Sequence, residues 1–422
     1  RYQHASDVRT DLQRLKRDTE TGKTATITGA DSDVTIAALA IGAAVFSSNQ
    51  HADKHSPIDS MAVLPVATNS NDQNAQFLSD GITDSLIDSL SQIPNLKVMS
   101  RNSVFHYKGR EIDPEAVGRE LKVKAVLTGR LVQQGDSLFL STELVNTSDD
   151  SHIWGEEFNR KASDVLPLQQ ELAQIIAQKL RVKLSSEQQQ TFARQGTQNP
   201  EAYALYVRGR YSFDRITEES LEQAVDFFRQ AIEKDPGYAA AYAELSRAYT
   251  MLGHYGYLRS TEAYTMAIAS AKRSIDLDSN LAEAHAALGR ASTETWNWML
   301  AERESRRAIE LNPNLSEAHL QYAVYLLNIG KVAEGGTEAR LAQEIDPLSP
   351  GPTNVLARAF WAQGNYDEAI AQFTKSLDTS PNAPSRTITC PTCTVPRGCM
   401  TVRSRNWSRR SPLRAGDGTR VL

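Results

Sequence analysis

The chain has 422 residues, which is too many for one ordinary domain and predicts two or three. Its hydrophobic content of 40% and charged content of 23% are those of a globular protein. The net charge of −5 is uneven, because residues 385–422 hold eight arginines against Asp417 and leave the rest strongly acidic. That acidity argues against nucleic acid as a partner, so we predict none. All three cysteines lie in this tail, which excludes a disulfide framework for the remainder.

Residues 1–24 predict an amphipathic helix, since Val8, Leu12 and Leu15 recur on one face. A helix this short needs a surface on which to bury that stripe. The letters RYQ at 1–3 and RLKR at 14–17 resemble the last helix of the C-lobe in bacterial serine/threonine protein kinases. The resemblance implies a remnant of a kinase domain. The chain has no kinase glycine-rich loop, HRD, DFG or APE motif, so we predict neither catalysis nor a cofactor.

Residues 25–57 form a linker that contains the apolar segment 34–46, VTIAALAIGAAVF. As a helix, these residues span about 20 Å, against a hydrocarbon core of about 30 Å. Receptor-type kinases of the resembling family carry a single membrane helix at this place. Two interpretations stay open. If 34–46 spans a bacterial inner membrane, the residues after about 50 are extracytoplasmic; otherwise the chain is cytoplasmic.

Residues 58–185 predict a compact α/β module, because short apolar runs alternate with helix-period patterns. The expected elements, in order, are a strand at 60–66, a helix whose apolar positions run from 77 to 90, a strand at 96–100, a helix at 114–121, a hairpin at 124–146 turning at Gly135, a strand at 152–158 and a helix at 166–180. The segments AVLP at 62–65, FLSDGIT at 77–83 and IW at 153–154 resemble the TolB-type amino-terminal domain. Bacterial kinases and adenylate cyclases carry that domain just before helical repeats.

Three features of this region are candidate sites. The polar loop 67–75 follows a strand and precedes a helix, where open α/β sheets bind ligands, although a solvated connection is favoured. Arg101, at the end of a strand, suits an anion or an ion pair. His51 and His55 have helical spacing but no third ligand, so we predict no metal site there.

Residues 199–382 predict five helix pairs of a tetratricopeptide superhelix. The boundary residues Pro236, Ser279, Pro313, Pro347 and Pro381 are 43, 34, 34 and 34 apart, and thirty-four is the tetratricopeptide period. We expect the nine extra residues of the long interval between the helices of that pair, at 253–261. Since one pair cannot bury its own apolar face, the pairs must stack on one another.

The first helices of such an array line a concave groove that holds an extended peptide. One groove-facing position recurs as Arg247, Arg290, Val324 and Arg358. Three arginines in four repeats predict a basic ladder for an acidic or carboxylate-ended protein segment. The alternative is a solvated, charged helix face.

Two further features, the repeated histidines and the C-terminal tail, are expected to lack a binding role. His285 and His319, 34 residues apart, are predicted to pack structurally. The tail 385–422 has no helical period and predicts an irregular, disordered segment. Its Cys390, Cys393 and Cys399 fall short of a four-ligand zinc site.

We therefore predict an α/β module followed by an all-α tetratricopeptide superhelix and a disordered C-terminal tail. With its resemblances, the sequence indicates the sensory and scaffolding region of a serine/threonine kinase, which binds proteins or peptides in the repeat groove. Two alternatives remain: a stand-alone TolB/tetratricopeptide adaptor, and the regulatory half of an adenylate cyclase with the same two modules.

Overall fold

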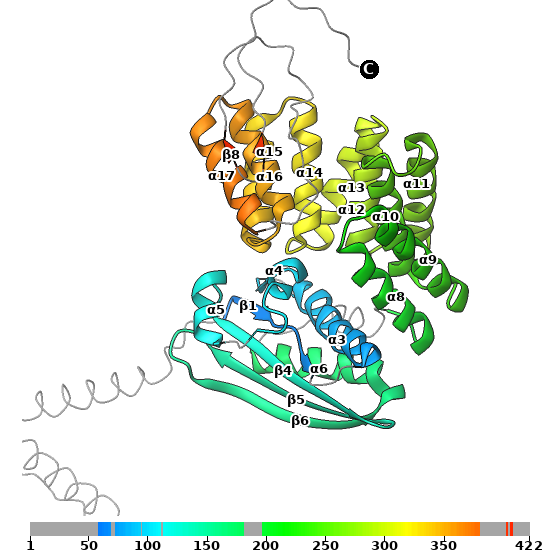
Figure 1. The fold of residues 1–422 in the computed structure, drawn as a ribbon, viewed down its shortest axis with the longest axis vertical. Helices are drawn as coiled ribbons and strands as arrows, with labels where there is room; N and C mark the ends of the chain where they lie inside the picture. Colours follow the sequence, from blue (N-terminus) through cyan, green and yellow to red (C-terminus); the bar gives the residue numbers. More distant parts are fainter. Residues whose placement is uncertain are drawn as a thin grey trace, which may run out of the picture. The chain divides into compact units, whose positions relative to one another are not determined.

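The computed structural model describes residues 58–379, except 69–71, 94, 111–112 and 181–195, together with two short stretches in the tail (Figure 1). The segments predicted at 1–24 and 34–46 lie outside the described residues. In the tail, β7 (Val402–Arg403) pairs with β8 (Asn406–Trp407) in an antiparallel ladder. No helix among the residues described is both long and apolar enough to cross a bilayer.

The first module is a mixed, six-stranded sheet in the order β3-β1-β4-β5-β6, with β2 also on β4. Its strands are β1 (Ser60–Val63), β2 (Ala67–Thr68), β3 (Lys97–Val98), β4 (Ala125–Gln134), β5 (Ser137–Asn146) and β6 (His152–Lys161). β1 runs parallel to β3 and β4, whereas β4, β5 and β6 form an antiparallel meander. Along β5, buried Leu138 and Leu140 alternate with the more exposed Phe139 and Ser141, so one sheet face carries the core.

The helices of this module are α3 (Gln73–Ser91), α4 (Arg101–Phe105), α5 (Pro114–Leu121) and α6 (Val165–Lys179), the last preceded by a 3-10 turn at Ala162–Asp164. α3 packs against α6. The helix α5 has the predicted bounds, because Asp113 caps its first turn and Pro114 stands where no amide donor is needed.

The structure corrects the predicted order of residues 60–75. The strand expected at 60–66 is shorter, since β1 ends at Val63, before Pro65, which has no amide to donate to the ladder. A second short strand, β2, follows at Ala67–Thr68. The polar loop predicted at 67–75 is shorter than expected: residues 67–68 pair with β4, and α3 already begins at Gln73, capped by Asp72.

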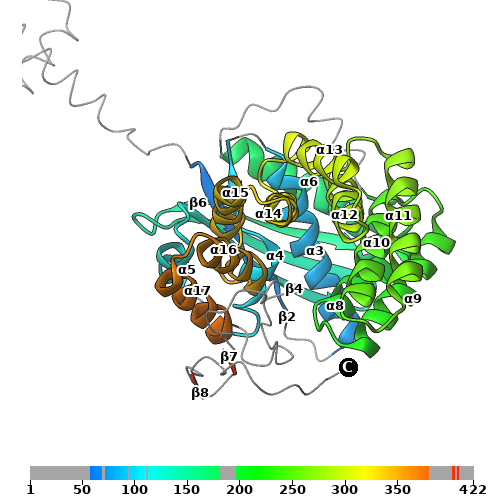
Figure 2. The same cartoon turned by 90° about the horizontal axis from the view of Figure 1, so that it is seen from above.

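Ten helices follow, and they confirm the five predicted pairs (Figures 1 and 2). They are α8 (Pro200–Phe213), α9 (Glu218–Lys234), α10 (Ala239–His254), α11 (Ser260–Leu277), α12 (Ala282–Glu294), α13 (Trp298–Leu311), α14 (Ser316–Asn328), α15 (Val332–Ile345), α16 (Pro350–Ala362) and α17 (Tyr366–Thr379). The expected insertion lies at the predicted place, around 253–261, but most of it is helical and does not lengthen the connection. The extra residues lengthen both helices of the pair, with 16 residues in α10 and 18 in α11 against 13 in α12 and 14 in α13.

Close helix approach within a pair depends on small residues. A Cβ on Gly209 of α8 would lie 2.5 Å from Phe228 Cε1 of α9, and Phe228 is fully buried. One on Gly289 of α12 would lie 2.6 Å from Ser305 Oγ of α13. These distances are shorter than carbon contacts allow, which explains the small residue that the sequence places at 289.

The sheet module and the first repeats share one hydrophobic core, which runs from Met61 to Ala291. α3 lies beside α8 (Figure 2). A Cβ at Gly81 of α3 would come within 2.7 Å of the Tyr203 hydroxyl oxygen and 2.8 Å of Val207 Cγ2 on α8. The glycine therefore permits the two modules to pack.

Replacing Gly81 with alanine should lower the free energy of unfolding by about 1–3 kcal/mol, because the added methyl overpacks the α3–α8 contact. Helix propensity alone predicts the opposite, a gain of about 1 kcal/mol. Chemical denaturation measures the sign. Gly336→Ala is the matched control, since its Cβ would meet Ala359 Cβ at an ordinary 3.4 Å. A more stable Gly81→Ala protein would contradict the close packing.

Candidate peptide-binding groove

The first helices, which were predicted to line a groove, lie in one row. Contacts join α10 to α12, α12 to α14, and α14 to α16. α8 stands at the head of this row, beside α10. The sheet module approaches the row at α8 and at two loops that join successive repeats.

The junction at α8 is a network of buried charge. Arg101 of α4 donates from Nε to Asp84 Oδ1 of α3 at 2.7 Å, and its Nη1 pairs with Asp214, which follows α8. Arg210 of α8 donates from Nη1 to Asp88 Oδ2 at 2.9 Å, and its Nε lies 3.6 Å from Asp84 Oδ2. Only 4% of the Asp84 side chain is exposed, against 10% for Arg101 and 13% for Arg210.

The pKa values of the two arginines in this network are set by burial and by the neighbouring carboxylates. Burial by itself lowers the pKa of Arg101, but Asp84 and Asp214 raise it above the ordinary arginine value. Asp84 likewise raises the pKa of Arg210 against the effect of burial. Both guanidinium groups thus stay charged. Removing one would leave the buried Asp84 with a single cation, and would leave Asp88 or Asp214, whose side chains are 41% and 40% exposed, without this partner.

Two loops between repeats hold the module farther along the superhelix. Asn312, after α13, donates from Nδ2 to Ser91 Oγ at 3.0 Å. Asp346, after α15, accepts from Ser103 Oγ at 2.6 Å and from Asn102 Nδ2 at 3.0 Å. Burial raises the pKa of Asp346 although these groups donate to it. The module is therefore fixed to the array at three places.

The predicted ladder residues already have partners within the protein. Arg247 donates to both carboxylate oxygens of Glu244, at 2.7 and 2.8 Å, and its guanidinium lies 4.7 Å from the centre of the Phe213 ring. Arg290 links three first helices, as it contacts Glu294 on its own helix, Gln321 on α14 and His254 on α10.

The two remaining positions of the ladder differ from each other. Val324 is 8% exposed and packs with Ala323 and Leu356, so its side chain belongs to the core at this point of the row. Arg358 is exposed and lies 3.4 Å from Asn328 Oδ1 of α14 through Nη2. The arginines thus bridge neighbouring first helices.

Glu283 on α12 belongs to the same row of helices, and its carboxyl group is partly without hydrogen-bond donors. Its Oε2 is buried, and no residue in the described part of the chain donates a hydrogen bond to it. Burial and the nearby Asp88 raise the pKa of Glu283 to about 7, with Glu244 adding to the rise and Arg210 opposing it. In the folded protein the neutral acid is therefore favoured only below about pH 7.

The repeated histidines are structural, as predicted. His285 shares a 2.6 Å contact between Nδ1 and Glu304 Oε2, and its Nε2 lies 3.1 Å from the Ser279 carbonyl oxygen. His319 makes the corresponding contacts with Glu338 and Pro313, at 2.7 and 2.9 Å. Each ring joins the two helices of its pair to the preceding loop.

Arg101 forms ion pairs, which confirms the simpler of its two predicted roles. Within the described ranges, no three His, Cys, Asp or Glu side chains converge as metal ligands. The pairs His51/His55 and Cys390/Cys393 fall outside those ranges. The sequence analysis did not single out Arg210 or Glu283, because their electrostatic neighbours on α3 are distant in the sequence. The repeat held a signal for both: Arg210 follows Gly209 as Arg290 follows Gly289, and Glu283 recurs as Glu317.

Comparison with known families supports the two modules separately. Residues 57–175 match a family model described as HilA/YgeH-like transcriptional regulator, second domain. Residues 353–384 match a tetratricopeptide repeat model. The helical part is thus a tetratricopeptide array, whereas the TolB-type resemblance of the sheet module has no support from these matches.

Two curated relatives share part of the chain. The putative adenylate cyclase 3 of Rhizobium meliloti (strain 1021) is 33% identical over 246 residues, which are 58% of this chain and 42% of that protein. Superkiller protein 3 of Schizosaccharomyces pombe is 26% identical over 188 residues, 43% of this chain and 13% of that protein. The chain spans less than half the length of either relative.

Solved structures of tetratricopeptide proteins are also similar to the chain. A thermophilic TPR protein of Thermus thermophilus is 19% identical with a TM-score of 0.36, covering 41% of this chain and 90% of that one. YrrB, described as a TPR protein with an unusual peptide-binding site, is 22% identical with a TM-score of 0.28, covering 43% and 87%.

Replacing Arg210 with alanine should lower the free energy of unfolding by about 1–3 kcal/mol, because the buried Asp84 keeps only Arg101 and the partly exposed Asp88 loses its partner. Chemical denaturation measures the loss, and amide hydrogen exchange should show faster opening of α3. The control is Arg215→Ala, which removes an exposed arginine that stacks on Tyr211 and donates to its hydroxyl at 2.8 Å. Equal stabilities of the two variants would contradict the role given to Arg210.

The pH dependence of stability should change in Glu283→Gln. The pKa of Glu283 is raised from 4.5 to about 7, so the folded state holds the proton more tightly than the unfolded chain. Its contribution is fully present below pH 4.5 and is lost as the pH rises through 7. Thermal unfolding should therefore show a smaller loss of stability between pH 5 and 8 in the variant than in the parent. The exposed Glu262→Gln should keep the parent's profile, and a Glu283→Gln profile identical to the parent's would refute the assignment.

Proposed function

We propose that this chain is the non-catalytic, protein-binding region of a bacterial signalling enzyme, with a groove that takes acidic segments. One observation carries the proposal: at the head of the row of first helices, Arg210 holds the carboxylate of Asp88 from α3 at 2.9 Å. An acidic helix is thus already held by an arginine of this surface. The same chemistry suits Arg290 and Arg358 farther along, where a charge-assisted bond to a carboxylate is roughly twice as strong as a neutral one.

The parent enzyme is a separate part of the proposal. The relative at 33% identity is named a putative adenylate cyclase, which supports a cyclase as the parent. The pattern at residues 1–17 resembles a kinase C-lobe helix and supports a serine/threonine kinase as the second candidate. With either parent enzyme, this chain would bind the partner protein and would not catalyse the reaction. An inner-membrane location through residues 34–46 belongs to the same proposal and rests on their apolar composition.

The groove is tested with fluorescein-labelled decapeptides rich in Asp and Glu, titrated against the purified chain by fluorescence anisotropy. The double variant Arg290→Glu with Arg358→Glu should weaken binding at least tenfold, since two attractive charges become repulsive. The control, Arg229→Glu with Lys272→Glu, makes the same charge change at exposed positions of second helices. Unchanged affinity in the groove variant, or equal losses in both, would contradict binding in the groove.

A further inference from the structure

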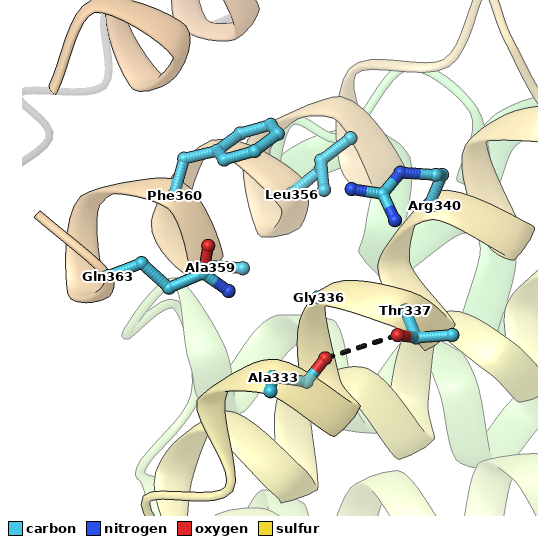
Figure 3. Close-up of a pocket in the computed structure, with 8 residues that line it drawn as sticks. All are labelled: Ala333, Gly336, Thr337, Arg340, Leu356, Ala359, Phe360 and Gln363. Atoms are coloured by element: carbon cyan, nitrogen blue, oxygen red, sulfur yellow. Dashed lines mark hydrogen bonds between the residues drawn. The ribbon is translucent and has the colours of Figure 1, made fainter. Parts of the chain in front are cut away.

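A second recessed surface lies between α15 and α16, where a cavity of about 120 Å³ opens (Figure 3). On α15 it is lined by a face that includes Gly336 and Arg340, and on α16 by one that includes Leu356, Ala359 and Gln363. The spacing is i, i+3, i+4 and i+7 on both helices, so two whole helix faces meet there.

This cavity faces away from the groove. Leu356 stands two residues before Arg358 on the same helix. Two residues of an α-helix turn through about 200°, so Leu356 points to the opposite side from the groove-facing arginine. Phe360, two residues after Arg358, lines the same cavity. A ligand here would not compete with one in the row of first helices.

The preceding repeat shows why the space is open. At the corresponding contact of α13 with α14, Tyr325 donates its hydroxyl to Glu302 Oε2 at 3.1 Å. Arg306 pairs with Glu302 at 3.0 Å and lies 5.4 Å from the centre of the Tyr322 ring. That interface is filled by a carboxylate, an arginine and aromatic rings.

Thirty-four residues later the arginine is kept and the other groups are lost. Gly336 replaces Glu302, Ala359 replaces Tyr325 and Leu356 replaces Tyr322, while Arg340 corresponds to Arg306. The missing side chains leave the cavity. Arg340 has lost the carboxylate partner that its counterpart holds, and it makes no hydrogen bond or ion pair with any residue in the described part of the chain.

The walls of the cavity are divided by polarity. Leu356 and Ala359 close the bottom of the cavity and are themselves buried, with Leu356 in a core cluster with Val355 and Ala323. Phe360 is the partly exposed apolar residue of the lining. The guanidinium of Arg340 and the amide of Gln363 stand at the rim (Figure 3). An enclosed apolar cavity of about 150 Å³ holds benzene, so this smaller but open one accommodates part or all of a ring.

We propose that the cavity binds a carboxylate carried beside a ring-sized apolar group. The carboxylate pairs with Arg340 as Glu302 pairs with Arg306, and the apolar group lies on the partly exposed Phe360 at the mouth of the cavity. Either the last residue of a polypeptide or a small aromatic acid presents this chemistry. The inference rests on the α15–α16 contact alone and is independent of the function proposed for the groove.

The test uses the full chain and N-acetyl-L-phenylalanine, with N-acetyl-L-phenylalaninamide as the probe that lacks only the carboxylate. Saturation-transfer NMR should show the acid binding at least tenfold more tightly than the amide. A pentapeptide, Gly-Ser-Gly-Ser-Phe with a free carboxylate, separates the sources. Binding at least as tight as that of the acid identifies a chain terminus, whereas weaker binding identifies a small acid.

Gly336→Glu restores the residue of the preceding repeat and should abolish binding, because its carboxylate takes Arg340 and its side chain fills the cavity. Arg340→Gln, an exposed change that leaves the packing intact, should weaken binding of the acid at least tenfold without affecting the amide. The groove variant Arg290→Glu with Arg358→Glu should bind the acid normally. The proposal is overturned if the acid does not bind, if acid and amide bind equally, or if the groove variant loses binding while Arg340→Gln retains it.

Discussion

Two guanidinium groups buried among three carboxylates hold the sheet module on the helical array. Arg101 reaches from the sheet module to Asp214, and Arg210 reaches back from α8 to Asp84 and Asp88. Buried ion pairs add little net stability over apolar packing, but they strongly disfavour any arrangement that leaves one charge alone. The network therefore fixes how α3 lies against α8. The apolar contacts around Gly81 and the bonds made by Asn312 and Asp346 fit that placement.

This arrangement bears on the proposed function, because the module occupies one end of the row of helices to which the proposed ligand would bind. The head of the row is engaged by α3, whereas Arg290 and Arg358 lie farther along it. The proposed carboxylate ligand would replace the bonds of Arg290 to Gln321 and of Arg358 to Asn328. A charged acceptor binds a guanidinium more strongly than an amide does. The ion pair of Arg290 with Glu294 limits the gain, so an acidic partner must displace or accommodate that carboxylate.

Periodic features of the chain were predictable from sequence, and contacts between modules were not. The helix pairs follow from a 34-residue repeat, and the α5 bounds follow from a cap and a proline at the expected places. The predicted end of the strand at 60–66 was wrong, because Pro65 cannot donate a ladder hydrogen bond although it stands in an apolar run. Asp84 and Arg210 are 126 residues apart and share no pattern, so only the folded chain shows them together. The cavity at Gly336 could be recognised only by comparing the side-chain contacts of successive repeats in the structure.

The direct test of the account is a double-mutant cycle on Arg101 and Asp214, the ion pair that crosses from the sheet module to the helical array. The free energies of unfolding of Arg101→Ala, Asp214→Ala and the double variant are measured by denaturant titration beside the parent. A pair in direct contact, with Arg101 buried and the Asp214 side chain 40% exposed, predicts a coupling free energy of about 1 kcal/mol. Single effects that add to within about 0.5 kcal/mol would show that the two side chains do not interact, and would contradict the docking of the modules.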